Sequence, residues 1–102
     1  MKTSKGGQFT TKSTYETRYA EILEKDNDVI IFEYEPFDIE YEFEGIKLYY
    51  TPDFLVSYLD GHEELIEVKP QKMVVWPKNQ AKFSAAKKSH KFFKVITEAE
   101  LM

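Results

Sequence analysis

Two carboxylates and a lysine stand in the sequence at a spacing that could bind a metal ion. Asp53 follows Pro52 at the start of one apolar run, and Glu67 and Lys69 lie near the end of the next apolar run. Because side chains alternate along a strand, Glu67 and Lys69 would point to the same face. Carboxylates without a His or Cys partner suit a hard cation, with Mg²⁺ preferred and Mn²⁺ as its substitute. Such a group of residues could carry out metal-assisted hydrolysis.

The residues between Asp53 and Glu67 predict a hairpin that would bring the two carboxylates together. Asp60-Gly61 is a strong hairpin signal, and it separates two apolar runs. A turn centred near Gly61 would place Glu67 opposite Leu55, two residues from Asp53, which is within cross-strand reach. The predicted patch therefore combines two acids with the neighbouring lysine, whose charge could steady a reacting group.

Glu16 is a third candidate carboxylate, at the start of the first predicted helix. Ser13 and Glu16 have the spacing of a capping box, in which Ser13 caps the helix and Glu16 bonds back to the Ser13 backbone amide. Spacing alone favours this capping role over a catalytic one, and Glu21 is a second candidate deeper in the helix. The helix is expected to end near Asn27, with an apolar face at Tyr15, Tyr19, Ile22 and Leu23.

The flanking segments predict an α/β domain around these residues. Residues 1–12, rich in Lys, Thr, Gly and Ser, indicate a flexible arm, and residues 13–102 indicate a single domain. Residues 29–34 are a β-rich run, and residues 37–44 alternate apolar with acidic side chains, as antiparallel strands with one solvated face do. We interpret these acids as a sheet surface rather than a calcium site, because they lack the Gly-centred loop of such a site.

Charge is distributed unevenly along the chain. The net charge is −4, yet residues 21–67 hold fifteen acids against Lys25 and Lys47, whereas residues 69–94 hold eight lysines and no acid. Such a lysine run is either the solvated face of a helix or a surface that binds phosphate. For an isolated run the solvated helix face is the preferred interpretation, but the position of this run directly after the candidate metal site favours a nucleic-acid surface. The candidate DNA-binding residues are Lys72, Lys78, Gln80, Lys82, Lys87 and Lys88. Among them, helical spacing from Asn79 places Lys78, Lys82, Lys87 and Lys88 mostly outward and in water.

The chain after Lys69 predicts a connection, a helix and a last strand. Met73–Trp76 is a short apolar run that we interpret as a strap packed over the core, with a dimer contact or a wedge against DNA as the alternatives. Pro77 suits the first turn of a helix that reaches about His90, whose inward residues would be Ala81, Phe83, Ala85 and Ala86. Residues 92–96 then predict a strand, and residues 97–100 a second capping box that opens a last helical turn.

Composition excludes several other classes of protein. The 102 residues contain no Cys, which excludes disulfides and thiolate metal sites. The sequence has no apolar run of membrane-spanning length and no signal-peptide pattern, so a cytoplasmic location is expected. It also contains no Ser-His-Asp or Cys-His arrangement and no phosphate-cradling Gly loop.

The motif residues and their order resemble those of the PD-(D/E)xK nucleases. The string YTPDFLV followed by IEVKP is similar to the TnsA-type transposon endonucleases, the phage endonuclease I resolvases and the phage head-completion nucleases. YETRYAEIL matches the early helical Glu of these families at Glu16, and NQAKFSAAKK with FFKVITEAEL matches their last helix and strand. The resemblance runs from about Thr14 to Leu101. It implies a restriction-endonuclease-like αβββαβ core, an α/β (α+β) fold with a central mixed sheet flanked by helices.

The same resemblance implies a role for each candidate residue. Glu16, Asp53, Glu67 and Lys69 would be the catalytic residues. Asp53, Glu67 and the backbone carbonyl of Val68 would bind Mg²⁺, and Glu16 would reach the ion through a water. Lys69 would steady the attacking water or the phosphate.

The expected function is that of a metal-dependent DNA endonuclease. It would process phage or mobile-element DNA in a bacterial host cell, with the head-completion nucleases as the nearest subgroup. One alternative is a non-catalytic DNA-binding module on the same fold, and another is a resolvase of Holliday junctions or branched DNA. A third is a protein-interaction domain that uses the acidic strands and Met73–Trp76. A homodimer is a further expectation.

Overall fold

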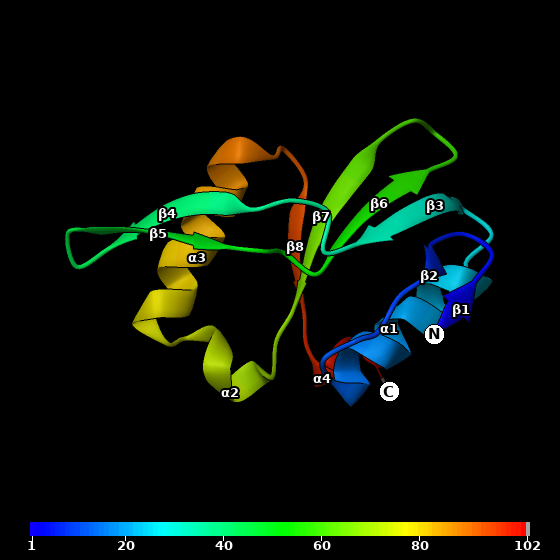
Figure 1. Cartoon of the computed structure of the whole chain (residues 1–102), viewed down its shortest axis with the longest axis horizontal. Coiled ribbons are helices and arrows are strands. Elements are labelled where there is room, and N and C mark those ends of the chain that lie inside the picture. Colours follow the sequence, from blue (N-terminus) through cyan, green and yellow to red (C-terminus); the bar gives the residue numbers. More distant parts are fainter. Residues whose placement is uncertain (102) are drawn as a thin grey trace.

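The computed structural model describes residues 1–101, and a four-stranded mixed sheet forms the centre of this part of the chain (Figure 1). In spatial order its strands are β3 (Val29–Tyr34), β6 (Phe54–Tyr58), β7 (Glu63–Val68) and β8 (Phe93–Ile96). β6 runs antiparallel to both β3 and β7, whereas β8 runs parallel to β7. A parallel pair needs a crossover connection, which the helical segment between β7 and β8 supplies. The predicted central mixed sheet is therefore confirmed.

One face of the sheet packs against the first and last helices. Successive side chains of a strand point to opposite faces, so Phe32, Phe54 and Ile66 share one core. This core is covered by α1 (Thr14–Lys25) and the short α4 (Glu98–Leu101). Because Phe54 follows Asp53 directly and is fully buried, the packing of this face fixes the start of β6.

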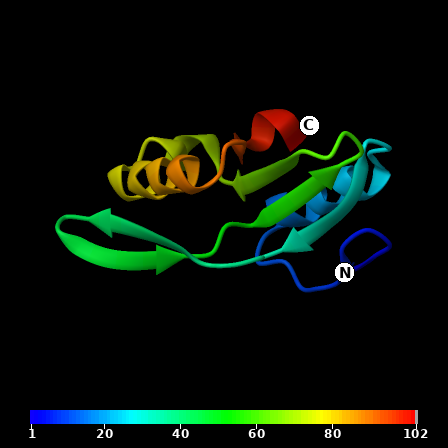
Figure 2. The ribbon, with the colours of Figure 1, turned by 90° about the horizontal axis from the view of Figure 1, so that it is seen from above.

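The opposite face packs against a helix and a separate hairpin. Leu65 belongs to this second core, which α3 (Pro77–Ser89) covers together with β4 (Ile39–Phe43) and β5 (Ile46–Tyr50). These two strands pair only with each other in the described part of the chain, and Figure 2 shows them extending beyond the main sheet alongside α3. The sequence predicted strands here but not their separation from the sheet. The hairpin is inserted between β3 and β6, so the remaining elements keep the predicted αβββαβ order.

The first helix begins as predicted but uses only half of the expected capping box. The Ser13 hydroxyl accepts a hydrogen bond from the Glu16 backbone amide at 3.2 Å, which stabilises the helix start. The Glu16 carboxylate accepts from the amide of Lys12 instead of that of Ser13, which corrects the second half of the prediction. The helix ends at Lys25, slightly before the expected Asn27.

The inward face of α1 differs from the prediction at one position. Tyr19 and Leu23 are buried, as expected, and Ala20 joins them. Ile22 is exposed, because the helical rotation of about 100° per residue carries it past the edge of the apolar stripe.

The first twelve residues make defined contacts with the sheet. They contain a small antiparallel pair, β1 (Lys2–Thr3) and β2 (Gly7–Gln8), and the Phe9 ring stacks on Tyr34 at 4.9 Å between ring centres. The Phe32 ring fills the space beside Gly6 so closely that a Cβ there would clash. Composition indicated neither the pairing nor these contacts, and the mobility expected of this segment stays a prediction.

The hairpin between β6 and β7 has a different register from the predicted one. Phe54 pairs with Ile66 and Leu55 with Leu65, so the connection is centred on Asp60, one residue before Gly61. Gly61 has a φ of +92° and is the last residue of a three-residue loop. In such hairpin loops the last residue adopts the left-handed conformation, which glycine allows. The prediction that Glu67 lies opposite Leu55 is therefore wrong. Continuing the observed register places Glu67 opposite Asp53, which brings the two carboxylates closer than predicted.

The connection after β7 is a single helical turn and not a packed strap. α2 (Gln71–Val74) follows Pro70, and Val75 and Trp76 after it are 72% and 50% exposed. The strap prediction is wrong for these two residues. The turn is held mainly by polar bonds to α3 rather than by burial, since the Asn79 side-chain amide donates to the Met73 carbonyl at 2.8 Å.

The C-terminal elements follow the predictions closely. Pro77 occupies the first turn of α3, and Phe83 and Ala86 are buried. In the turn that opens α4, the Thr97 amide donates to the Glu100 carboxylate at 2.7 Å, as a capping box requires. Among residues 1–101, no helix is both long enough and apolar enough to cross a membrane.

Candidate active site

Asp53 and Glu67 meet where β6 begins and β7 ends. The Asp53 amide donates to the Ile66 carbonyl at 3.1 Å, and the Asp53 carboxylate accepts from the Val68 amide at 2.7 Å. Both side chains are almost enclosed, with 9% and 5% of their surface exposed. The backbone pairing of the two strands thus fixes both carboxylates at one end of the central sheet.

Burial gives this pair unusual electrostatic properties. Loss of solvation raises the pKa of Asp53, the neighbouring Glu67 carboxylate raises it further, and the Val68 amide opposes the rise. Loss of solvation also raises the pKa of Glu67, while Lys69 and Lys82 act in the opposite direction. The ionised form of each carboxylate is therefore disfavoured, and a cation placed between the two carboxylates would stabilise that form.

One oxygen of Glu67 is left without a partner. Oε1 is buried and accepts no hydrogen bond from any described residue, whereas Oε2 lies 3.6 Å from Lys69 Nζ. An unpaired buried carboxylate oxygen is costly unless something binds it. A hard divalent cation fits this donor set, because it prefers carboxylate oxygens and would satisfy the free one.

Lys69 is positioned by the strand that runs parallel to its own. Its backbone amide donates to the Ile96 carbonyl of β8 at 2.9 Å, which extends the pairing one residue beyond β7. Its side chain is about one-fifth exposed, so the ammonium group sits at the border between the buried carboxylates and solvent.

Glu16 joins the site from the first turn of α1, where it is buried. Its Oε1 accepts hydrogen bonds from the Lys12 amide, at 3.1 Å, and from the Tyr34 hydroxyl. The charge of Glu16 also raises the pKa of Asp53 and of Glu67, which shows that its carboxylate shares their environment. Within residues 1–101, however, no three acidic or His side chains already converge as ligands of one ion.

Tyr34 is a site residue that the sequence did not reveal. It lies at the end of β3, and burial and the Glu16 contact both raise the pKa of its hydroxyl, so this group stays a proton donor. Its ring is held between Phe9 and Phe54, at 4.9 and 5.3 Å between centres. Sequence spacing holds no signal for this role, because Tyr34 and Glu16 come from different elements.

Lys82 is partly buried, contrary to the prediction that it lies in water. Its Nζ lies over the rings of Tyr50 and Tyr41, 5.6 and 5.9 Å from their centres. Burial and the nearby Lys69 lower its pKa, and Glu67 acts against them. The predicted position in water is wrong because the β4–β5 hairpin covers this side of α3.

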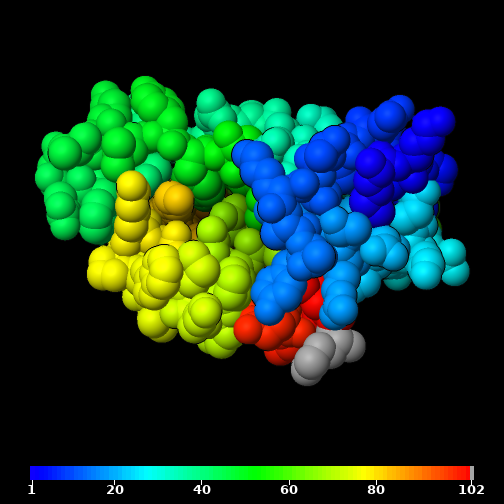
Figure 3. Space-filling model, turned by 60° about the horizontal axis from the view of Figure 1, so that its bottom comes forward, coloured from blue at the N-terminus to red at the C-terminus, as the bar shows by residue number. Residues whose placement is uncertain are grey.

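The other predicted DNA-binding residues remain at the surface. Lys72, Lys78, Lys87 and Lys88 are exposed, and the Gln80 side chain donates to the Val74 carbonyl at 2.6 Å. In Figure 3, the yellow-green residues around the end of β7 and α2 lie between α1, in blue, and α3, in yellow.

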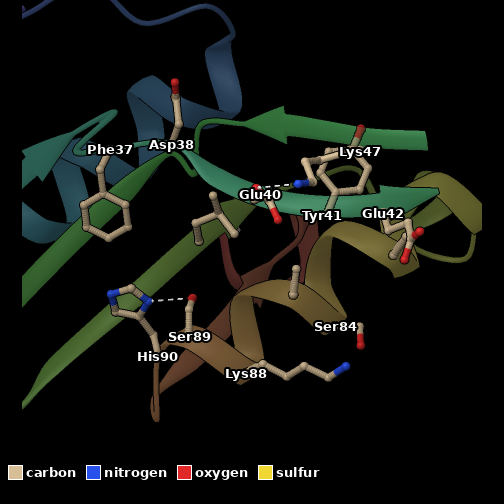
Figure 4. A pocket seen from close by; sticks show the side chains of 13 residues that line it. Phe37, Asp38, Glu40, Tyr41, Glu42, Lys47, Ser84, Lys88, Ser89 and His90 are labelled. Carbon is tan, nitrogen blue, oxygen red and sulfur yellow. Dashed lines mark hydrogen bonds and ion pairs between the residues drawn. The ribbon is translucent and has the colours of Figure 1, made fainter. Parts of the chain in front are cut away.

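Lys88 lies apart from the carboxylate pair. It lines a groove of about 840 Å³ between β4 and α3, together with the acids Asp38, Glu40 and Glu42 (Figure 4). This groove is the largest hollow described, yet Asp53 and Glu67 do not line it. The acids of its wall would repel a phosphate backbone.

One comparison with known proteins found a match. The family model described as TnsA-like endonuclease N terminal matches residues 26–98, which is more than half of the chain. The matched segment contains Asp53, Glu67 and Lys69 but begins after Glu16. No curated protein matches the sequence.

Proposed function

The chain belongs to the TnsA-like endonuclease family, of the PD-(D/E)xK type, and on this premise we propose that it is a metal-dependent DNA endonuclease. Its reaction would be the hydrolysis of a phosphodiester bond. The observation that carries the proposal is the buried pair of Asp53 and Glu67, with one Glu67 oxygen unpaired and Lys69 beside it. A pair held in this way is poorly explained by folding alone, because burial of two neighbouring acids destabilises the fold.

Four groups of this chain fit the binding of Mg²⁺, with Mn²⁺ as its substitute. Asp53, Glu67 and the Val68 carbonyl would bind the ion directly, and Glu16 would reach it through a water. The bound cation supplies a water of lowered pKa and offsets negative charge on the scissile phosphate and the leaving oxygen. Lys69 would hold the attacking water or the phosphate, since its ammonium group stands at the solvent border of the site.

DNA is the proposed partner, and charge supports one direction of approach. The lysines between β7 and β8 lie on elements that follow Glu67 directly, whereas the acids of the β4–β5 hairpin would repel phosphate. Lys72 and Lys78 would contact the DNA backbone and position it without reading its bases. Phage or mobile-element DNA processing, a homodimer and a cytoplasmic location stay predictions.

Cleavage assays with and without metal test this function. Purified protein should cut supercoiled, linear or branched DNA with Mg²⁺ or Mn²⁺, and EDTA should stop the reaction. Preference for branched DNA would favour the resolvase alternative, whereas DNA binding without cleavage would favour the non-catalytic module. Absence of both cleavage and binding would leave the protein-interaction alternative.

Asp53→Asn supplies the residue-level test. The substitution keeps the side-chain shape and the acceptor for the Val68 amide but removes one negative charge, so cleavage should be abolished with little loss of DNA binding. Asp28→Asn, at an exposed position before β3, is the matched control and should cut normally. Cleavage at the wild-type rate by Asp53→Asn would show that this site assignment is wrong.

A further inference from the structure

Val75 and Trp76 form an exposed apolar patch between α2 and α3. They are 72% and 50% exposed, and Trp76 is the only tryptophan of the sequence. The patch comes a few residues after Lys69, on the connection that leaves the candidate active site. Exposed aromatic and aliphatic side chains that adjoin each other indicate a surface that binds another molecule.

The backbone holds this patch rigidly. The Trp76 amide donates to the Met73 carbonyl at 3.2 Å, and the Gln80 amide donates to the Trp76 carbonyl at 3.0 Å. The side chains of Asn79 and Gln80 donate to the Met73 and Val74 carbonyls, at 2.8 and 2.6 Å. Two side-chain amides of α3 thus hold the backbone of this turn. The backbone of Val75 and Trp76 therefore loses little conformational freedom when these residues bind a partner.

The charge around the patch is positive. Lys72 and Lys78 flank it and are exposed, and the sequence holds no acid between Glu67 and Glu98. A protein partner with an acidic surface would pair with the lysines but would leave the exposed apolar side chains without a matching surface. A nucleic acid fits both the positive charge and the exposed apolar side chains, because its phosphates pair with lysines and its bases offer a flat apolar face.

We propose that Trp76, supported by Val75, is a stacking platform for an unpaired DNA base beside the active site. This inference rests on the proposed function, because it takes DNA as the partner of the same face. Stacking needs a base that is free of its duplex neighbours, so the platform would favour DNA with single-stranded segments, such as flaps, frayed ends or branch points. Lys72 and Lys78 would hold the adjoining phosphates.

The fluorescence of Trp76 tests this directly, because no other tryptophan contributes to the signal. The titration would use Asp53→Asn protein with Mg²⁺, so that the DNA stays intact, and anisotropy of labelled DNA would measure binding separately. An oligothymidine should quench Trp76 strongly, whereas a blunt duplex of equal length should quench it weakly. Binding of oligothymidine by anisotropy without quenching would overturn the platform while leaving the proposed function intact. No binding of either DNA would overturn both.

Substitutions give a second readout. Trp76→Ala should weaken oligothymidine binding by about tenfold and duplex binding by less than about twofold, and Trp76→Phe should restore most of the loss. Tyr49→Ala removes another exposed aromatic side chain, from the acidic β4–β5 hairpin, and should change neither affinity. Equal losses for both DNAs in Trp76→Ala would contradict the inference. A change of Trp76 fluorescence with protein concentration in the absence of DNA would also contradict it, because a second copy of the chain would then cover the patch.

Discussion

Glu16 is the residue whose surroundings allow two roles to be separated. Its backbone amide receives the Ser13 cap, while its carboxylate bonds the Lys12 amide and the Tyr34 hydroxyl in a buried position. The cap therefore depends on the Glu16 backbone and not on its charge. The carboxylate is free of the capping role that spacing favoured, which makes its charge available to the Asp53–Glu67 pair.

Glu16→Gln should leave the fold intact and impair cleavage. A glutamine can still accept both hydrogen bonds through its side-chain oxygen, so the melting temperature should stay near that of wild type. Cleavage at saturating DNA should fall by about a hundredfold or more, because a positioned charge is lost from the site. Single-turnover rates and thermal melting measure the two effects.

Glu21→Gln is the matched control on the same helix, since Glu21 is exposed. It should change neither rate nor melting temperature. Full activity of Glu16→Gln would return Glu16 to a purely structural role. Tyr34→Phe should lower the rate less than Glu16→Gln does, because it removes only the bond that orients the carboxylate.

At the scale of elements, α3 divides its lysines into two groups. Lys82 lies over the tyrosine rings of the β4–β5 hairpin and shares the environment of Lys69 and Glu67, whereas Lys87 and Lys88 are exposed. The sequence pattern grouped all three as outward residues, because periodicity records only the direction in which a side chain leaves the helix. Because the hairpin packs against α3, the Lys82 side chain lies over tyrosine rings instead of pointing into water.

Lys82→Met should therefore reduce the cleavage rate itself. Methionine keeps a flexible apolar side chain beside the tyrosine rings and removes the ammonium group, so the melting temperature should change little. We expect the rate at saturating DNA to fall about tenfold, which corresponds to about 1.4 kcal/mol of transition-state stabilisation. A normal rate with weaker DNA binding would place Lys82 among the ordinary backbone contacts.

The exposed lysines predict a different result. The double substitution of Lys87→Ala with Lys88→Ala should leave the rate at saturating DNA unchanged. If these lysines contact phosphates of duplex DNA, each lost contact should flatten the slope of log affinity against log salt by roughly 0.9. Lys88 borders the acidic groove, so a change for Lys87 alone would show that only the outer lysine reaches DNA. An unchanged slope would make both residues part of a solvated surface.

At the scale of the whole molecule, the buried carboxylates of the candidate active site destabilise the folded state. Burial raises the pKa of Asp53 to about 8 and that of Glu67 to about 7, so the folded protein holds protons that the unfolded chain releases. Between the ordinary carboxyl range and these values, folding becomes less favourable as pH rises. The proposed metal would reverse this effect, because it binds the ionised carboxylates of the folded state only.

The metal-free protein should therefore lose stability from about pH 4 to about pH 8. At a pH above the folded-state pKa, each unit by which folding raises the pKa of one carboxyl lowers the free energy of unfolding by about 1.4 kcal/mol. A loss of 1 kcal/mol lowers the melting temperature by about 4–8 °C in a domain of this size. Melting curves in EDTA at several pH values measure the loss. Mg²⁺ should raise the melting temperature more at pH 8 than at pH 5.

Asp53→Asn isolates the contribution of the buried pair. The pKa of His62 is also raised in the folded protein, so the stabilising contribution of this residue is likewise lost as pH rises. The quantity to compare is therefore the difference in stability between wild type and variant. The variant should show a shallower loss and a smaller gain from Mg²⁺. Parallel curves for the two proteins would mean that the pair does not control this pH dependence.

The sequence alone determined the local elements and the identity of the carboxylate pair. A β-rich run predicted β3, alternation predicted β4, and the Ser13 hydroxyl predicted the start of α1. Asp53 and Glu67 stood out by type and spacing. These features depend on neighbours within a few residues, so their signals lie in short stretches of sequence. The resemblance of the motifs extended this to the αβββαβ core and to the nuclease family, which the family match confirmed.

Tertiary structure decided which distant residues surround that pair. The three-residue loop placed Glu67 opposite Asp53, and the packing of β3 beside α1 gave Glu16 the Tyr34 hydroxyl. The tyrosine rings of the β4–β5 hairpin partly cover Lys82. No periodicity encodes these contacts, because each joins elements that are far apart in the chain and depends on where both elements pack. Burial of the carboxylates, which gives the site its electrostatic character, is likewise a property of the assembled sheet and its helices.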